Sequence, residues 1–155
     1  MSVRWSEFET REPELAATSR RLLYPIGPTG PGLGFLATPR PDGGPRVHPV
    51  CAALHEGGLY VFVMGASPKR FDLERDGRYA LHAYPAEKDD ESFYCIGRAR
   101  AVSDAAERAR AVPAFTHHVK PEEALFELRL HRVLHTTWLY PRQPGTRPVY
   151  HRWQP

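Results

Sequence analysis

Two adjacent cations, Lys69 and Arg70, follow the dipeptide Ser67-Pro68, which predicts the start of a short helix. A serine there accepts a hydrogen bond from a free backbone N–H, and proline at the first helical position sacrifices no hydrogen bond. Cations are unfavourable at this end because a helix N-terminus carries partial positive charge. An anion bound to the first turn would remove the conflict. The sequence therefore indicates an anion site, with a solvated pair of surface cations as the alternative.

The histidines do not predict a metal site. His131 and His135 are four residues apart, a spacing that suits a shared metal ion on a helix. On a strand they lie about 13 Å apart at roughly 3.3 Å per residue, which is too far to share an ion. His117 and His118 lie in a proline-flanked loop and are expected to be solvated. For His48, on a predicted strand, a hydrogen-bonded barrel histidine and a catalytic role both stay open.

No Ser-His-Asp order, nucleophile elbow or GxxxxGK phosphate loop is readable in the sequence. Any enzymatic chemistry would therefore come from a bound cofactor. The net charge of +3 is mild and the arginines are scattered, whereas a nucleic-acid-binding protein is expected to carry a basic stripe with interleaved aromatic residues. We therefore expect no nucleic-acid partner, and keep single-strand binding through Phe and Tyr side chains as a further alternative.

The helix that begins at Pro68 must be positioned by short strands. Five segments have the apolar or alternating pattern of strands, and they cover residues 33–38, 46–54, 59–64, 78–84 and 93–102. A turn rich in proline, aspartate and glycine joins the first two, which predicts a hairpin. The third leads through a small-residue turn into the helix, and Gly97 interrupts the fifth.

The remaining segments predict helices and two late strands. Residues 9–23 and the segment from Ser103 read as helices, and the second has the acidic first turn that a helix dipole favours. The run 121–140 is ambiguous, but even spacing of its apolar side chains favours a strand from residue 126 onward. The tail, 147–153, adds a candidate edge strand. Together these elements predict a mainly β fold, a mostly antiparallel barrel with two or three peripheral helices.

The chain of 155 residues fits one domain over residues 1–155, with the barrel over about 33–153. Its 41% apolar and 25% charged residues are typical of a soluble globular protein. No run is long enough to span a membrane, and the N-terminus lacks the features of a signal peptide. We therefore expect a cytoplasmic protein without a membrane partner. Cys51 and Cys95 are expected to stay reduced inside strands.

The motifs ATPRPDGGPRVHPV, LYVFVMGASPKRFDLERDGRYAL and YCIGRARAV occur in this order. This arrangement resembles the split-β-barrel flavoproteins of the pyridoxamine phosphate oxidase-like superfamily. The family pattern has a strand ending in Ala-Thr, a PDG-x-P turn, a second strand with a proline, and a third strand that enters a small-residue turn with serine and lysine. The resemblance implies an antiparallel split β-barrel that binds FMN.

The resemblance also implies a homodimer with two cofactors at its interface, either FMN or a deazaflavin (coenzyme F-420). In such proteins the serine-lysine turn holds the cofactor phosphate, a role that passes here to Ser67, Lys69 and Arg70. A C-terminal aromatic residue, Trp138 or Trp153, is the candidate to cover the partner's cofactor. The ring lies along the second and third strands, and the backbone groups expected to line it belong to Val47, His48, Pro49, Val50, Phe62, Val63 and Met64.

The implied activity is that of a flavin-dependent oxidoreductase, which moves hydride to or from a small organic molecule. The substrate and the catalytic residues stay unassigned. The alternative is a non-catalytic split barrel that stores a cofactor or binds haem.

Overall fold

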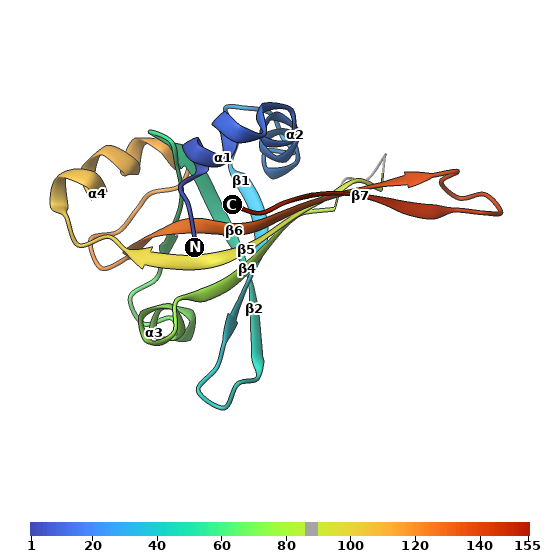
Figure 1. Cartoon of the computed structure of the whole chain (residues 1–155). Helices are drawn as coiled ribbons and strands as arrows, with labels where there is room; N and C mark the ends of the chain where they lie inside the picture. Colours follow the sequence, from blue (N-terminus) through green and yellow to red (C-terminus); the bar gives the residue numbers. More distant parts are fainter. Residues whose placement is uncertain (86–89) are drawn as a thin grey trace.

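The computed structural model of the chain describes residues 1–85 and 90–155 (Figure 1). Its seven strands are β1 Gly32–Pro39, β2 Pro45–His55, β3 Gly58–Val63, β4 Arg78–Ala83, β5 Ser92–Ala101, β6 Ala124–Leu139 and β7 Arg147–Trp153. They form one antiparallel sheet in the order β3-β2-β1-β4-β5-β6-β7, and β3 also pairs with β6. Strands β1 to β6 therefore close into a barrel, and β7 extends the sheet beyond it. This confirms the predicted fold class and all the predicted strands.

The predicted interruption at Gly97 is a β-bulge. The register between β5 and β6 shifts between Ile96 and Gly97. A Cβ atom at residue 97 would lie 1.8 Å from the carbonyl oxygen of Arg129, so only glycine fits where the two backbones approach.

The described residues form four α-helices, α1 Trp5–Arg11, α2 Pro13–Leu23, α3 Pro68–Arg75 and α4 Ala105–Ala111, the last followed by a 3₁₀ turn over Val112–Ala114. The prediction of two or three helices was one short, because the segment 9–23 belongs to two helices. Glu12, which precedes a proline, leaves the helical conformation, and its N–H closes α1 on the carbonyl of Phe8. The helix predicted from Ser103 begins at Ala105, and Asp104 caps it, since the Asp104 carboxylate accepts a hydrogen bond from the Glu107 N–H.

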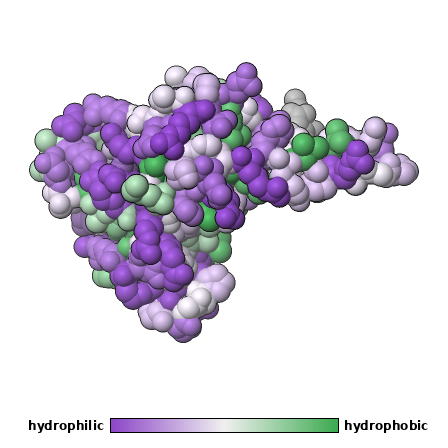
Figure 2. All heavy atoms as spheres, in the orientation of Figure 1, coloured by the Kyte–Doolittle hydropathy of each residue, from purple (hydrophilic) through white to green (hydrophobic). Residues whose placement is uncertain are grey.

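The end of β6 and the start of β7 form a hairpin that projects from the barrel as an arm (Figure 1). The arm carries exposed large apolar side chains, which are Trp138, Leu139, Tyr140 and Tyr150. Figure 2 shows the arm beyond the body of the molecule, with a few hydrophobic atoms among hydrophilic ones. Trp153 lies at the base and is buried, with its ring centroid 4.9 Å from that of Phe8. The two candidate tryptophans therefore differ, because only Trp138 is accessible.

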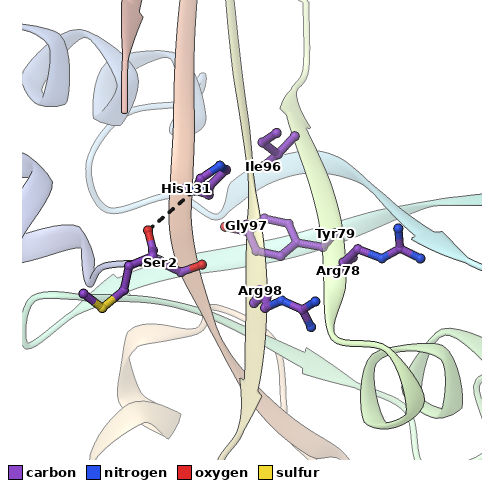
Figure 3. Close-up of a pocket in the computed structure, with 8 residues that line it drawn as sticks. Ser2, Arg78, Tyr79, Ile96, Gly97, Arg98 and His131 are labelled. Carbon is purple, nitrogen blue, oxygen red and sulfur yellow. Dashed lines mark hydrogen bonds between the residues drawn. The ribbon is translucent and has the colours of Figure 1, made fainter. Parts of the chain in front are cut away.

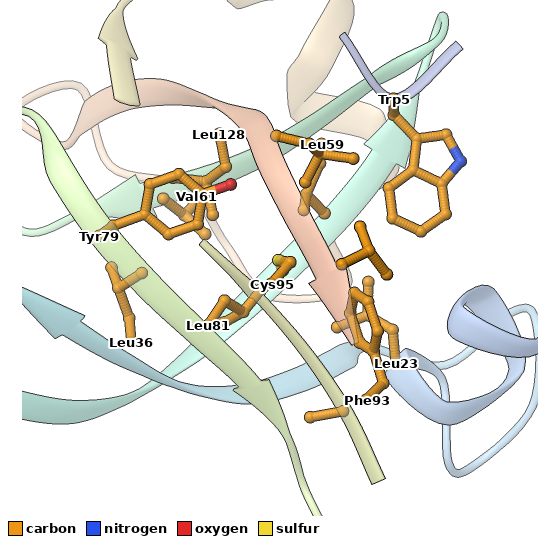
Figure 4. Packing of buried hydrophobic residues seen from close by; sticks show 14 of the residues in the cluster. Trp5, Leu23, Leu36, Leu59, Val61, Tyr79, Leu81, Phe93, Cys95 and Leu128 are labelled. Atoms are coloured by element: carbon orange, nitrogen blue, oxygen red, sulfur yellow. The ribbon is translucent and has the colours of Figure 1, made fainter. Parts of the chain in front are cut away.

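The barrel interior is filled by apolar side chains from every strand of the barrel, and α1 and α2 cover one side (Figures 1 and 4). Trp5 and Phe8 from α1 and Leu23 from α2 are completely or almost completely buried in this core. Cys95 is also buried and free, and its burial raises the pKa of its thiol to about 12. Such a thiol packs as a small apolar side chain. Within the described residues, no helix is both long and apolar enough to cross a membrane.

Candidate functional site

Strands β2 and β3 diverge at one end of the barrel. They pair only between Ala52–His55 and Gly58–Val61, while the earlier part of β2 pairs with β1 alone. Beyond Val61, residues Phe62 and Val63 pair with β6 on their other side. Both strands therefore leave a backbone edge without a strand partner in the described chain. Such edges present unpaired N–H and C=O groups, which proteins usually cover or use for binding.

Helix α3 is attached to this diverging end through a buried carboxylate. Asp72 is only 1% exposed and accepts hydrogen bonds from Thr38 Oγ1 at 2.9 Å, Arg46 Nε at 2.7 Å and Arg75 at 3.2 Å. Burial raises the pKa of Asp72, but these hydrogen bonds outweigh it and hold the pKa below the ordinary carboxyl value. The neighbouring Leu73 is part of the barrel core. The helix start is thus fixed relative to the open edge of β2.

Lys69 is the half-buried cation in the first turn of α3. No hydrogen bond or ion pair joins its ammonium to another described residue, and burial lowers its pKa from the ordinary lysine value. A charge that loses water without gaining a partner is costly. The side chain is therefore suited to an anion that the polypeptide does not supply.

Arg70 and Ser67 behave differently from the prediction. Arg70 does not share an open anion site on equal terms with Lys69, because its Nε lies 2.8 Å from Glu74 and another nitrogen donates to the Gly65 carbonyl. Ser67 is the N-cap of α3, as predicted, but its hydroxyl makes no capping hydrogen bond. Its hydroxyl therefore stays available beside the helix start.

The predicted residues of β2 lie on both faces of the strand. Val47 and Pro49 are exposed on the outer face, and Val47 is 58% exposed. His48 pairs in register with Leu36, a buried residue of the barrel interior, so it lies on the inner face with Val50. The structure brings these residues to the open edge but does not direct their side chains to one point.

The predicted residues after β2 are placed less uniformly. Phe62 packs away from the main core against Phe115, with ring centroids 4.9 Å apart, while Val63 is completely buried. Only their backbone groups are candidates for the site, as the prediction states. Met64 follows β3 and is 66% exposed, so its side chain is free to cover a bound molecule.

Sequence reasoning missed Arg46. Its guanidinium reaches α3 through Asp72, which places a second cation against the helix that carries Lys69. The signal lay in the sequence, since Arg46 is the only arginine or lysine in the second predicted strand. Its partner Asp72 is 26 residues away, so nothing local indicated the contact.

The family model for pyridoxamine 5'-phosphate oxidase matches residues 28–137, which include β1 to β5 and nearly all of β6. The chain belongs to this family. The resemblance drawn from the motifs is therefore confirmed. No curated protein matches the chain.

Solved structures share the fold of this family member at low sequence identity. A haem-binding protein from Mycobacterium smegmatis is 20% identical with a TM-score of 0.61, and the match covers 86% of this chain and 57% of that one. An F420 reductase is 18% identical with a TM-score of 0.55, covering 71% and 94% of the two chains. A NimC/NimA family protein from Clostridium acetobutylicum is 17% identical with a TM-score of 0.54, covering 77% and 84%. The chain thus spans little more than half of the haem-binding protein.

Metal ligands do not gather in the part of the family fold that the structure describes, where no group of three or more His, Cys, Asp or Glu side chains is arranged to hold an ion. His131 and His135 both lie on β6, as the strand prediction for this segment requires.

Proposed function

We propose that this chain is a flavin-dependent oxidoreductase that uses FMN or the deazaflavin coenzyme F-420 to move hydride to or from a small organic molecule. Membership of the pyridoxamine 5'-phosphate oxidase family supports a flavin-type cofactor. The F420 reductase among the structural neighbours supports the deazaflavin as one of the two candidates. When bound, the flavin or deazaflavin supplies the hydride chemistry.

The observation that carries the proposal is the half-buried, unpartnered ammonium of Lys69. A cofactor phosphate at the start of α3 would pair with this ammonium, and the Ser67 hydroxyl and the helix dipole would add to the attraction. The guanidinium groups of Arg46 and Arg70 add positive charge near the helix start, although they already form ion pairs with Asp72 and Glu74. The residues present therefore fit a phosphorylated cofactor.

The open backbone edges of β2 and β3 are the proposed place for the ring. A flavin-type ring has N–H and C=O groups along one edge, which complement unpaired backbone groups. In this proposal the backbone of Val47, His48, Pro49 and Val50 orients the ring, and Met64 excludes water from one side. These residues bind the cofactor and position its ring. No residue of the chain is assigned a proton transfer.

We propose a homodimer in which a second copy covers the cofactor. The outer face of the sheet beside the open edge is apolar, since Phe35 is 39% exposed and stacks on Tyr84. On β2, Pro49 lies opposite Phe35, and the exposed Val47 lies two residues further along the same face. Contiguous exposed apolar surface of this kind favours a protein partner. The arm with Trp138 is the proposed element that reaches the partner's cofactor.

The experiment is cofactor binding to the purified full-length protein, followed by the visible absorbance of FMN or coenzyme F-420 after equilibrium dialysis. Lys69→Ala is expected to weaken binding about 10- to 100-fold, because a charge-assisted hydrogen bond contributes about 1.5–3 kcal/mol. Lys120→Ala is the matched control, since Lys120 is exposed and lies in a loop. Equal affinity of the two variants would contradict the assignment of Lys69.

Haem binding without catalysis is the second candidate, because one structural neighbour is a haem-binding protein and the structural match covers 86% of this chain. His48 is the one imidazole among the proposed site residues. Titration with hemin separates the candidates: a sharp Soret band that is lost in His48→Ala would favour haem. Reduction and reoxidation of bound FMN or F-420 by a chemical donor would favour the oxidoreductase.

A further inference from the structure

A pocket of about 450 Å³ lies on the outer surface of the barrel, where β4, β5 and β6 run side by side. Figure 3 shows Arg78 and Arg98 on one side of it, His131 on the other, and Tyr79 and Ile96 between them. Arg78 and Arg98 come from neighbouring strands and face each other in register. Three basic side chains thus surround an apolar centre.

The apolar floor depends on the bulge at Gly97. Because a Cβ atom there would lie 1.8 Å from the Arg129 carbonyl oxygen, no side chain can stand at this point and cover the Tyr79 ring. The Tyr79 hydroxyl donates to the same carbonyl at 3.1 Å. The hydroxyl is therefore engaged. Tyr79 belongs to the barrel core and is only 4% exposed, so it offers a ligand little surface, and the half-buried Ile96 supplies the rest of the apolar floor.

The charge at the rim is not neutralised. Both carboxylate oxygens of Asp76 accept hydrogen bonds from Arg78, at 2.6 and 2.7 Å. Among residues 1–85 and 90–155, Arg98 donates only to the Asp76 backbone carbonyl, at 2.9 Å. Two guanidinium groups against one carboxylate leave one positive charge, and it resides on Arg98. The side chain of Arg98 is exposed, so its remaining N–H groups are accessible.

From this arrangement we infer that the pocket binds a small monocarboxylate with an aromatic or bulky apolar body. The planar guanidinium of Arg98 matches a carboxylate, and the floor of Tyr79 and Ile96 matches the apolar body. The pocket is separate from the proposed cofactor site, because Lys69 lies in the first turn of α3 whereas Arg78 follows the other end of this helix. A helix of the length of Pro68–Arg75 is about 12 Å long. The inference does not depend on the proposed function.

The test is a titration of the ¹⁵N-labelled full-length protein with 2-naphthoate, followed by NMR. The amide signals of Gly97 and Arg98 are expected to shift in a saturable way, while that of Lys69 stays in place. The neutral analogue 2-naphthamide is expected to bind at least about fivefold more weakly, because a hydrogen bond to a charged group contributes more than one between neutral groups.

Two variants locate the binding site. Arg98→Ala is expected to raise the Kd of 2-naphthoate about tenfold, whereas Arg147→Ala, the same charge change on the arm, leaves it unchanged. Ile96→Glu is a second, independent test of the site, needed in case Arg98→Ala does not fold. It places a carboxylate on the floor of the pocket and is expected to abolish 2-naphthoate binding. FMN or F-420 binding is expected to persist in Arg98→Ala, and 2-naphthoate binding is expected to persist in Lys69→Ala. The experiment therefore tests the cofactor site and the carboxylate pocket independently of each other.

Three results would overturn the inference. These are equal affinity for 2-naphthoate and 2-naphthamide, equal Kd values for Arg98→Ala and Arg147→Ala, and saturable shifts confined to other surfaces such as the face of Phe35 and Val47.

Discussion

Lys69 combines two properties that oppose each other in the free protein, a positive charge and partial burial without a partner. Burial lowers its pKa, so the folded state binds fewer protons than the unfolded state at alkaline pH. Stability contributed by this group therefore rises as pH increases from the lowered folded pKa toward the ordinary value of 10.5. A bound phosphate would reverse this preference, because it favours the charged ammonium.

The first prediction is that Lys69→Gln does not destabilise the cofactor-free protein at pH 7, and that the alkaline rise in stability expected of the natural protein is absent from the variant. The physical reason is the removal of a desolvated charge. The free energy of unfolding from urea titrations at pH 7 to 10.5 measures both effects. A loss of several kcal/mol in Lys69→Gln at pH 7 would show that the ammonium has a stabilising partner.

Asp72 has the opposite role, since it is a buried charge that is fully hydrogen-bonded. The second prediction is that Asp72→Asn lowers the free energy of unfolding by about 2–3 kcal/mol at pH 7. Because its folded pKa lies below the ordinary carboxyl value of 3.8, this stabilisation is complete above about pH 4 and disappears as pH falls through the folded pKa.

Urea unfolding of both proteins between pH 3 and 7 measures the second prediction. The difference between them should shrink below about pH 4. Asp42→Asn is the control, since Asp42 lies exposed in the β1–β2 turn and asparagine keeps its hydrogen bond to the Gly44 N–H. If Asp72→Asn and Asp42→Asn lowered the free energy of unfolding by the same amount, Asp72 would not anchor α3.

At the scale of elements, local signals in the sequence were sufficient for most strands and for α3. Ser67-Pro68 and alternating apolar residues act over a few positions, and the structure has the elements where these signals predict them. The ion pair between Arg70 and Glu74 could also have been predicted, because residues four apart on a helix face each other. Giving Arg70 the same free role as Lys69 overlooked this spacing.

Contacts between distant elements could not be predicted in this way. The even spacing in β6 places Glu127 on the polar side of the strand, yet the structure buries it to 1% exposure. Its carboxylate accepts hydrogen bonds from Arg4, Arg100 and Arg129. Arg4 comes from 123 positions earlier in the chain. A two-residue period reports which face a side chain is on but not what covers that face.

The third prediction concerns the β-bulge at Gly97, where the pairing of β5 with β6 shifts its register. Gly97→Ala is expected to lower the free energy of unfolding by at least about 1–3 kcal/mol, because the new methyl group must displace backbone atoms. Gly43→Ala is the control: its Cβ meets nothing within 4 Å, and it suffers only from the positive φ of 84°. A smaller loss in Gly97→Ala than in Gly43→Ala, measured in urea, would show that the strands adjust freely.

For the whole molecule, the pairing of β3 with β6 closes the barrel, whereas the divergence of β2 from β3 opens one end of it. The sequence contains both strands but not their pairing, because closure joins residues more than 60 positions apart. The family pattern supplied what local signals could not, the split form of the barrel. The same open end leaves the apolar outer face of β1 and β2 without a cover in one chain.

The last prediction follows from that uncovered face. Val47→Asp is expected to convert the proposed homodimer to a monomer, because a carboxylate buried in an apolar interface costs several kcal/mol. Since Val47 is 58% exposed in the single chain, the fold should persist. Sedimentation velocity measures the oligomeric state, and circular dichroism the fold. Ile26→Asp adds the same charge to another exposed apolar side chain, in the loop after α2. The sedimentation of Ile26→Asp should match that of the natural protein. If Val47→Asp remained a dimer, the interface would lie elsewhere, and the proposed position of the cofactor ring beside it would also be wrong.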